Sequence, residues 1–143
     1  MSFDLKISKG DISLQRDGSL SLVSKNSKLR QDIVKIILTD LGENKFHKNY
    51  GSAVGRLNIG SYSSRDVVDM DIRVSVESAL KKLMSLQKAQ ARKQFVSPGE
   101  MLVKILNVSA ERDFSDPRLY NVYVSVLTGE LNEIREGLTI RIA

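Results

Sequence analysis

Apolar residues recur at every third or fourth position from residue 27 to residue 41, a spacing that predicts an amphipathic helix. Asn26 or Ser27 can cap its start, because a short side-chain oxygen accepts a backbone N–H that has no partner there. Gly42 suits the left-handed conformation that often follows a helix. The predicted buried face consists of Leu29, Ile33, Ile36, Ile37 and Leu41.

A second, longer helix is predicted from Ser63 or Ser64 to about Gln94. Ser63 and Asp66 have the spacing of a capping box, with aspartate as the acidic partner. The last turns, residues 87–93, are almost wholly polar and are expected to project from the domain or to contact a neighbour. The apolar stripe comprises Val68, Ile72, Val76, Ala79, Leu80, Leu83 and Leu86, widened in the first half by Val67, Met70 and Val74.

The segment between the two helices is predicted to be an anchored loop. A connector with several apolar side chains is expected to pack on the core and not to swing free. The expected anchors are Phe46, Tyr50, Val54 and Leu57, with Gly51, Gly55 and Gly60 between or after them.

Strand-like alternation marks both ends of the chain. Residues 3–23 alternate apolar and polar positions, with turn signals at residues 9–11 and 17–18, and are expected to cover an edge or to pair outside the main core. Residues 101–109 are apolar at nearly every position, which is typical of a strand covered on both faces. Residues 118–127 and 137–142 alternate cleanly.

This order of elements predicts an α+β fold. We expect an N-terminal β-meander and two main helices packed on one face of a mainly antiparallel C-terminal sheet of about three strands. The chain of 143 residues is expected to be one domain, residues 1–143. Within it, residues 1–25 hold the N-terminal strands, residues 26–96 the helices and the loop, and residues 97–143 the C-terminal strands.

The charge is unevenly distributed. The net charge is +5, and most of the surplus falls between residues 25 and 56. A basic face of this kind suits nucleic acid, an acidic membrane or an acidic protein, and it is equally typical of a solvated helix surface. The basic residues of this stretch are Lys25, Lys28, Arg30, Lys35, Lys45, Lys48 and Arg56, against Asp32, Asp40 and Glu43.

The sequence offers little chemistry for catalysis. There is no cysteine, which excludes disulfides and thiolate metal sites, and the single histidine, His47, has no carboxylate at ligand spacing. Residues 51–55 lack the lysine and the preceding strand of a phosphate loop. The basic stretch lacks an RNA-binding signature or interleaved aromatics. We therefore expect a binding or structural protein and no enzyme, with no cofactor and no metal.

Residues 29–57 resemble the signature region of the contractile-tail baseplate wedge proteins that initiate the sheath. That family occurs in phage tails, in related bacteriocins and in type VI secretion baseplates. The matching elements are the helix end Ile37-Leu38-Thr39, the loop Tyr50-Gly51-Ser52 and, in the second helix, residues 77–80. The resemblance covers about residues 27–142. The family's Glu-Pro-Arg tripeptide is replaced here by Ser97-Pro98-Gly99, which keeps only the proline.

The resemblance implies a structural protein of the inner baseplate, present in six copies around a tail tube. Its location would be the virion, with assembly in the host cytoplasm. Its partners would be the sheath protein, which adds a strand to the C-terminal sheet, and neighbouring wedge proteins. The basic face would meet acidic wedge or tube neighbours, and neither a membrane nor nucleic acid is expected. The implied partner-binding residues are Tyr50, Gly51, Ser97, Pro98, Gly99, Leu138, Thr139, Ile140, Arg141 and Ile142.

Three alternatives stay open. A type VI secretion baseplate subunit would have the same role in a bacterial machine. A basic nucleic-acid-binding domain is the alternative from another class, and its binding would fall steeply with salt. A cell-wall hydrolase is the last, since some relatives have been labelled lysozyme-like.

Overall fold

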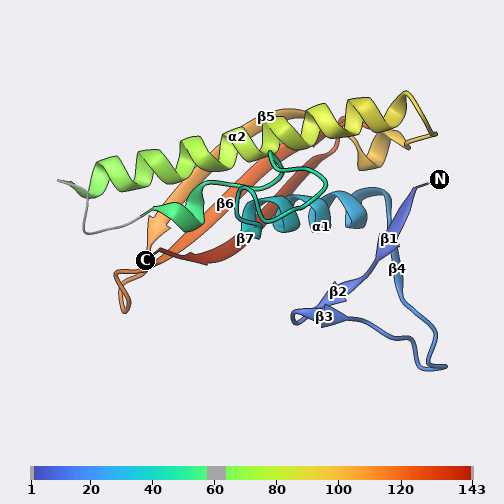
Figure 1. Cartoon of the computed structure of the whole chain (residues 1–143), viewed down its shortest axis with the longest axis horizontal. Coiled ribbons are helices and arrows are strands. Elements are labelled where there is room, and N and C mark those ends of the chain that lie inside the picture. Colours follow the sequence, from blue (N-terminus) through green and yellow to red (C-terminus); the bar gives the residue numbers. More distant parts are fainter. Residues whose placement is uncertain (1, 58–63, 143) are drawn as a thin grey trace.

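A computed structural model describes residues 2–57 and 64–142. Two helices cover one face of a three-stranded antiparallel sheet, and a separate arm of short strands leaves the body near the N-terminus (Figure 1). The predicted α+β fold is confirmed. None of the helices in the described residues is long and apolar enough to cross a membrane.

The sheet consists of β5 (Leu102–Arg112), β6 (Leu119–Thr128) and β7 (Glu133–Arg141), in the order β5-β6-β7. The β6–β7 register runs without a break from Leu119 opposite Arg141 to Leu127 opposite Glu133. Every second residue of β6 faces the helices, as the alternation predicts. The inward side chains Tyr120, Val122, Val124 and Val126 are all at most 2% exposed.

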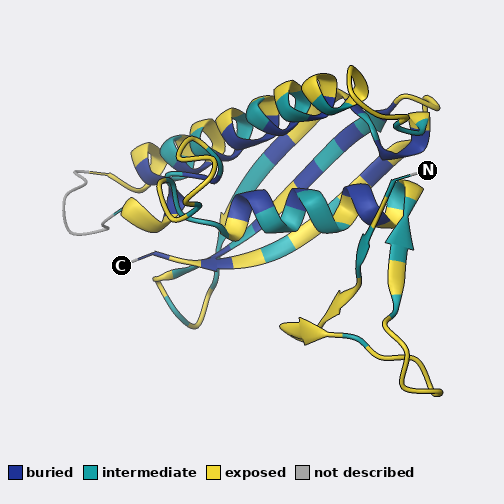
Figure 2. Ribbon diagram, turned by 45° about the vertical axis from the view of Figure 1, so that its right-hand side comes forward, coloured by how far each residue is buried: buried dark blue, intermediate teal, exposed yellow. Residues whose placement is uncertain are grey.

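The prediction that the first strand of this sheet is covered on both faces is wrong. Val103 and Leu106 of β5 are 49% and 43% exposed. Both helices lie on the same side of the sheet, so the outward side chains of β5 have no layer above them (Figure 2). An apolar run shows that a strand is hydrophobic, but it does not show that a second layer exists to cover it.

Helix α1 (Lys25–Leu38) buries Leu29, Ile33, Ile36 and Ile37, as predicted. It ends earlier than expected, because Thr39 is extended, with φ −85° and ψ 128°. The N–H and the hydroxyl of Thr39 both bond to the carbonyl of Lys35, at 3.0 and 2.6 Å. The chain then turns extended, so Leu41 is only half-buried in the loop.

Both predicted caps of α1 are wrong. The residue before the helix is Ser24, and its side chain makes no capping bond, so neither Asn26 nor Ser27 holds the cap position. Gly42 does have a left-handed φ of +91°, but it lies in the loop beyond the end of the helix.

Helix α2 (Arg65–Ala91) crosses the sheet with Val68, Ile72, Val76, Ala79, Leu80 and Leu83 buried, as predicted. The expected widening of this stripe is wrong: Val67, Met70 and Val74 are 42%, 66% and 51% exposed. The helix packs on a single layer, and these three side chains lie on its outer side. The predicted capping serine, Ser63, lies outside the described residues, and Ser64 precedes the helix without a side-chain cap bond.

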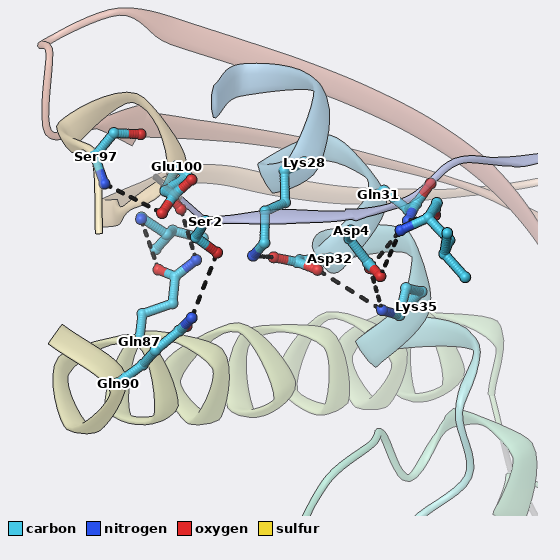
Figure 3. Close-up of polar contacts among 12 residues, drawn as sticks. Ser2, Asp4, Lys28, Gln31, Asp32, Lys35, Gln87, Gln90, Ser97 and Glu100 are labelled. Carbon is cyan, nitrogen blue, oxygen red and sulfur yellow. Dashed lines mark hydrogen bonds and ion pairs between the residues drawn. The ribbon is translucent and has the colours of Figure 1, made fainter. Parts of the chain in front are cut away.

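The polar end of α2 does not simply project. Gln87 is 4% exposed, and its amide binds the backbone where the sheet begins (Figure 3). Its Nε2 donates to the carbonyl of Glu100, and its Oε1 accepts from the N–H of Leu102, each at 2.8 Å. The side chain thus takes the place of a neighbouring strand, satisfying a C=O and the N–H two residues on.

The N-terminal arm, residues 3–24, consists of β1 (Phe3–Leu5), β2 (Ile7–Ser8), β3 (Asp11–Ile12) and β4 (Leu22–Ser24). Strand β1 pairs with β4 and β2 with β3, in small sheets separate from the main one. The prediction that these strands pair outside the main core is confirmed. Figures 1 and 2 show the arm extending away from the helices and largely exposed.

A second glutamine fixes the base of the arm. Gln31 of α1 donates from Nε2 to the carbonyl of Leu5 at 2.8 Å and accepts from the N–H of Ile7 at 2.9 Å. This is the same C=O and N–H pattern that Gln87 binds at the start of β5. Two helices therefore each hold the outer edge of a strand with one side-chain amide.

Replacing Gln87 with alanine is expected to lower the free energy of unfolding by about 2–4 kcal/mol, because two buried backbone groups lose their partners. Gln90→Ala is the matched control, since among the described residues the Gln90 amide reaches only the hydroxyl of Ser2, at 3.5 Å. Urea unfolding measures both. Equal losses for the two variants would show that the Gln87 amide does not hold the strand.

Candidate partner-binding surfaces

The outer edge of β7 carries backbone groups that the sheet does not use. Residues in an antiparallel pair alternate between bonding inward and pointing their N–H and C=O outward. The N–H of Ile142 bonds to the carbonyl of Arg118, so Ile142 and every second residue before it bond toward β6. The residues whose N–H and C=O point outward are therefore Glu133, Arg135, Gly137, Thr139 and Arg141.

Arg30 closes one part of this edge. Its Nη1 donates to the carbonyl of Arg135 at 2.7 Å and pairs with the carboxylate of Glu136 at 3.0 Å. Within residues 2–57 and 64–142, the outward backbone groups of Gly137 and Thr139 have no partner. Arg30 thus occupies one carbonyl of this edge, that of Arg135, and the edge is open from residue 137 onward.

The side chains of this open segment divide between two faces. Ile140 and Ile142 are 4% and 0% exposed and belong to the core, and Leu138 is packed against it. Thr139 and Arg141 lie on the uncovered face, where the Thr139 hydroxyl bonds to Asn121 at 2.9 Å. A partner at this edge would therefore meet backbone first, and of the five predicted residues here only Thr139 and Arg141 offer side chains.

The uncovered face of the sheet is hollowed beside this edge. A shallow depression of about 500 Å³ is lined by residues of all three strands, among them Leu106, Tyr123 and Gly137. A Cβ added to Gly137 would lie 3.3 Å from the Tyr123 ring, so the ring lies beside the bare backbone of this edge residue. Such cover compensates for the missing side chain of an edge glycine.

Ser97, Pro98 and Gly99 are largely built into the fold. Pro98 and Gly99 belong to a short 3-10 helix, η3 (Pro98–Glu100), between α2 and β5. The carbonyl of Pro98 accepts the N–H of Gly129 at 3.0 Å. Gly99 is buried, and an added Cβ would lie 3.0 Å from Asn26 Oδ1. Ser97 is half-buried, so the ring of Pro98 is the part of this segment that faces solvent.

Glu100 is the buried carboxylate of this corner. It is 1% exposed, and its Oε1 accepts the N–H of Ser97 at 3.1 Å (Figure 3). No hydrogen-bond partner among the described residues reaches its Oε2. Because the side chain is buried, a bulky substrate cannot reach it. Its hydrogen bond to the N–H of Ser97 instead holds the turn between α2 and β5 in place.

Tyr50 and Gly51 hold the loop against the end of α1. Gly51 has a φ of +120°, and a Cβ there would lie 2.5 Å from the carbonyl oxygen of Thr39. The next residue, Ser52, bonds to Thr39 through its N–H and to Ile37 through its hydroxyl, at 2.8 and 2.6 Å. Tyr50 is half-buried, and burial raises the pKa of its hydroxyl. The structure thus gives both residues an internal packing role.

The expected anchoring of this loop is confirmed in part. Val54 is buried, and Tyr50 and Leu57 pack against the core. The prediction for Phe46 is wrong, since its side chain is 92% exposed. Gly60 lies outside the described residues.

An ion pair joins the arm to α1 beside Gln31. Lys35 Nζ and Asp4 Oδ2 are 2.7 Å apart (Figure 3). Burial alone would raise the pKa of Asp4, but the hydrogen bond and charge of Lys35 hold it below its ordinary value. Burial alone would lower the pKa of Lys35, but Asp4 raises it. The pair therefore stabilises the attachment of the arm at pH values between the pKa of Asp4 and the pKa of Lys35. Its stabilising effect is lost as Asp4 becomes protonated in acid or as Lys35 becomes deprotonated in base.

This fold occurs in another solved protein. A crystal structure from Geobacter sulfurreducens, described as that of a "putative tail lysozyme", superposes with a TM-score of 0.65 over 87% of this chain and 97% of that one, at 13% identity. No protein-family model matches the sequence, and no curated protein matches it. At this identity the likeness establishes the shared fold alone.

Sequence reasoning missed Arg30, Gln31 and Gln87 as organising residues. Gln87 follows Val76, Leu80 and Leu83 at helical spacing, so its place on the buried stripe was a readable signal. Gln31 and Arg30 carry no such signal, because the strand edges they bind come from distant parts of the chain.

Gly51→Ala is expected to destabilise the fold by at least about 2 kcal/mol, since an added methyl meets backbone that cannot yield. Gly18→Ala is the control, because Gly18 has a φ of +83° but no atom within 4 Å of an added Cβ. It is expected to cost only about 1 kcal/mol, the price of the left-handed conformation. Thermal unfolding compares the two, and equal losses would contradict the close contact at Gly51.

Proposed function

We propose that this protein is a structural component of a contractile-tail baseplate, where the open edge of β7 receives a strand of the first sheath ring. The observation that carries the proposal is the row of outward backbone groups on β7 beyond the Arg30 cap. The fold shared with a protein named for a tail supports the setting, as do the helix and loop residues that resemble the wedge family.

Main-chain pairing suits this role. A strand that adds to a sheet edge gains hydrogen bonds with little demand on its side chains. Each bond contributes about 0.5–1.5 kcal/mol net, so a few of them give an interaction that needs further contacts to be stable. The exposed Thr139 and Arg141 and the adjacent hollow beside Tyr123 supply such contacts on the uncovered face.

Contacts with neighbouring wedge proteins would fall to the exposed Pro98 and to Lys45 and Lys48 of the loop, which are exposed, because Lys28, Arg30 and Lys35 of α1 are held in ion pairs. Ser97 and Gly99 are committed to the fold, so a wedge contact through this segment would use the proline ring. Six copies around a tube would place the same edge at each position of the first sheath ring. A type VI secretion baseplate would use the same edge in the same way, and gene neighbours distinguish the two settings.

A cell-wall hydrolase is the alternative that the neighbour's name favours. Burial and the charge of Asp66 raise the pKa of Asp69, a property of a general acid. However, the hollow that both line is formed by residues of α2 alone, whereas a glycosidase places two carboxylates across a groove. Clearing of a peptidoglycan suspension by the purified protein, lost in Asp69→Asn, would favour the hydrolase.

The sheath proposal is tested at Thr139. Thr139→Pro removes an N–H that points outward, so it blocks strand addition while sparing the bonds to β6. Tails assembled with this variant are expected to lack sheath in electron micrographs, and Thr139→Ala, which keeps the N–H, to carry sheath of normal length. Deleting the strand is unsuitable, because Ile140 and Ile142 belong to the core.

Circular dichroism establishes whether the Thr139→Pro protein is folded. A folded Thr139→Pro protein that supports full-length sheath would contradict strand addition at β7.

A further inference from the structure

One face of the arm is predominantly apolar, with Ser24 opposite Phe3 as a polar exception. Residues directly opposite each other in an antiparallel pair project from the same side of the ribbon. Leu5 lies opposite Leu22, and Ile7 opposite Ile12. An isolated bridge places Leu14 opposite Leu20, and alternation adds Phe3. The residues between them on the strands, such as Asp4, Lys6, Ser13 and Ser21, lie on the other side.

This apolar face is uncovered by the described residues. It differs sharply from the inner face of the main sheet, whose side chains are almost fully buried. Figure 2 shows the arm extending away from the body, and Gln31 of α1 contacts it at its base, at Leu5 and Ile7. The exposed fractions are 63% for Phe3, 46% for Ile7, 49% for Ile12, 61% for Leu14, 49% for Leu20 and 52% for Leu22.

The arm is held in one conformation. At its centre three strands meet through the bonds Lys6 N–H to Ser21 O, Ser13 N–H to Lys6 O and Ser21 N–H to Ser13 O, at 2.8–2.9 Å. At its base the Gln31 amide and the Asp4–Lys35 pair fix it to α1. A preformed surface binds without the entropic cost of ordering itself.

The charges around the arm indicate what covers it. Lys6 and Asp11 alternate with the apolar residues and lie on the other face. The arm's remaining basic residues, Lys9, Arg16 and Lys25, form no ion pair within the described residues and are opposed by Asp17, because Asp4 is already paired with Lys35. The rim is therefore positive. A second copy would bring the same positive rim, and the whole chain carries +5, so arm-to-arm pairing between copies would place like charges together.

We propose that the arm is a docking surface for an amphipathic helix of a different protein, with an apolar stripe that covers the arm and acidic residues along its flanks. A helix is the natural cover for the apolar face of a small sheet. The acidic flanks follow from the excess of Lys and Arg on the rim. This surface is separate from the edge of β7, so it does not depend on the proposed sheath contact.

The size of the patch sets the expected strength. An apolar patch on the order of 500 Å² is smaller than the roughly 800 Å² per partner of a standard interface. An isolated helix is therefore expected to bind weakly, with the rim charges deciding which helix binds. In an assembly, the arm would act together with other contacts to the same partner.

Two designed helical peptides with the same leucine stripe test the proposal, one flanked by Glu and the other by Lys. Fluorescence anisotropy with the full chain is expected to show at least about tenfold tighter binding of the Glu peptide. Amide NMR spectra are expected to shift at residues 3–24. Leu14→Ser, on the apolar face, should abolish binding, and Ser13→Ala, on the opposite face, should not.

Leu14 is largely exposed, so its replacement should leave the thermal unfolding temperature nearly unchanged, and this is measured first. Absence of binding, equal binding of both peptides, or binding that survives Leu14→Ser would each overturn the proposal. Sedimentation velocity tests whether a second copy of the chain occupies the surface instead. A dimer of the full chain that Leu14→Ser dissociates would make a second copy the partner and would overturn the proposal of an acidic helix.

Discussion

The inner face of β6 forms one core with the buried stripes of α1 and α2. Because burial is confined to this side of the sheet, the exposed face of the sheet lies on the opposite side. Ile33, Ile72 and Val122 come from the three elements and are each 0% exposed. Burying a side chain of this size contributes about 1.5–3 kcal/mol, so such residues dominate the stability of a domain this small. Because both helices occupy the same face, the described residues leave the other face of the sheet uncovered.

Some strand edges of this protein are capped by side chains, whereas the described residues leave part of the β7 edge uncapped. Unpaired edges invite association with other chains, and proteins usually close them. Here Gln87 closes the start of β5, Gln31 closes β1, and Arg30 occupies a carbonyl of β7. A chain that closes its edges with helix-borne side chains, and leaves residues 137–141 open, has an edge available for pairing. The apolar face of the arm is also uncovered, but it offers contacts to apolar side chains, whereas the β7 edge offers backbone hydrogen bonds.

The periodic patterns predicted the elements well and their surroundings poorly. The stripes of both helices and the alternation of β6 follow from local spacing, which is why their buried residues could be named in advance. Val103, Leu106 and Met70 are equally apolar, yet they are exposed, because no pattern within a strand or helix tells whether a second layer lies beyond it. The arm is the extreme case, since residues 3–7, 12–14 and 20–22 alternate and the described residues leave most of their apolar side chains exposed.

The candidate site was predictable only in outline. The last strand was expected to meet a partner, and the structure places its outward backbone groups at that edge. The choice of Ser97, Gly99, Tyr50 and Gly51 came from family resemblance, and the structure shows them packed against their own chain. Their contacts join segments far apart in sequence, such as Gly99 beside Asn26, and local patterns carry no information about such pairs.

Hydrogen exchange at the edge of β7 tests the central claim most directly. In the isolated protein, the amides of Gly137 and Thr139 are expected to exchange rapidly, while those of Leu138 and Ile140, which bond to β6, exchange slowly. In assembled tails all four are expected to exchange slowly. Slow exchange of Gly137 and Thr139 in the isolated protein, or rapid exchange that persists in the assembly, would contradict an open edge that receives a strand.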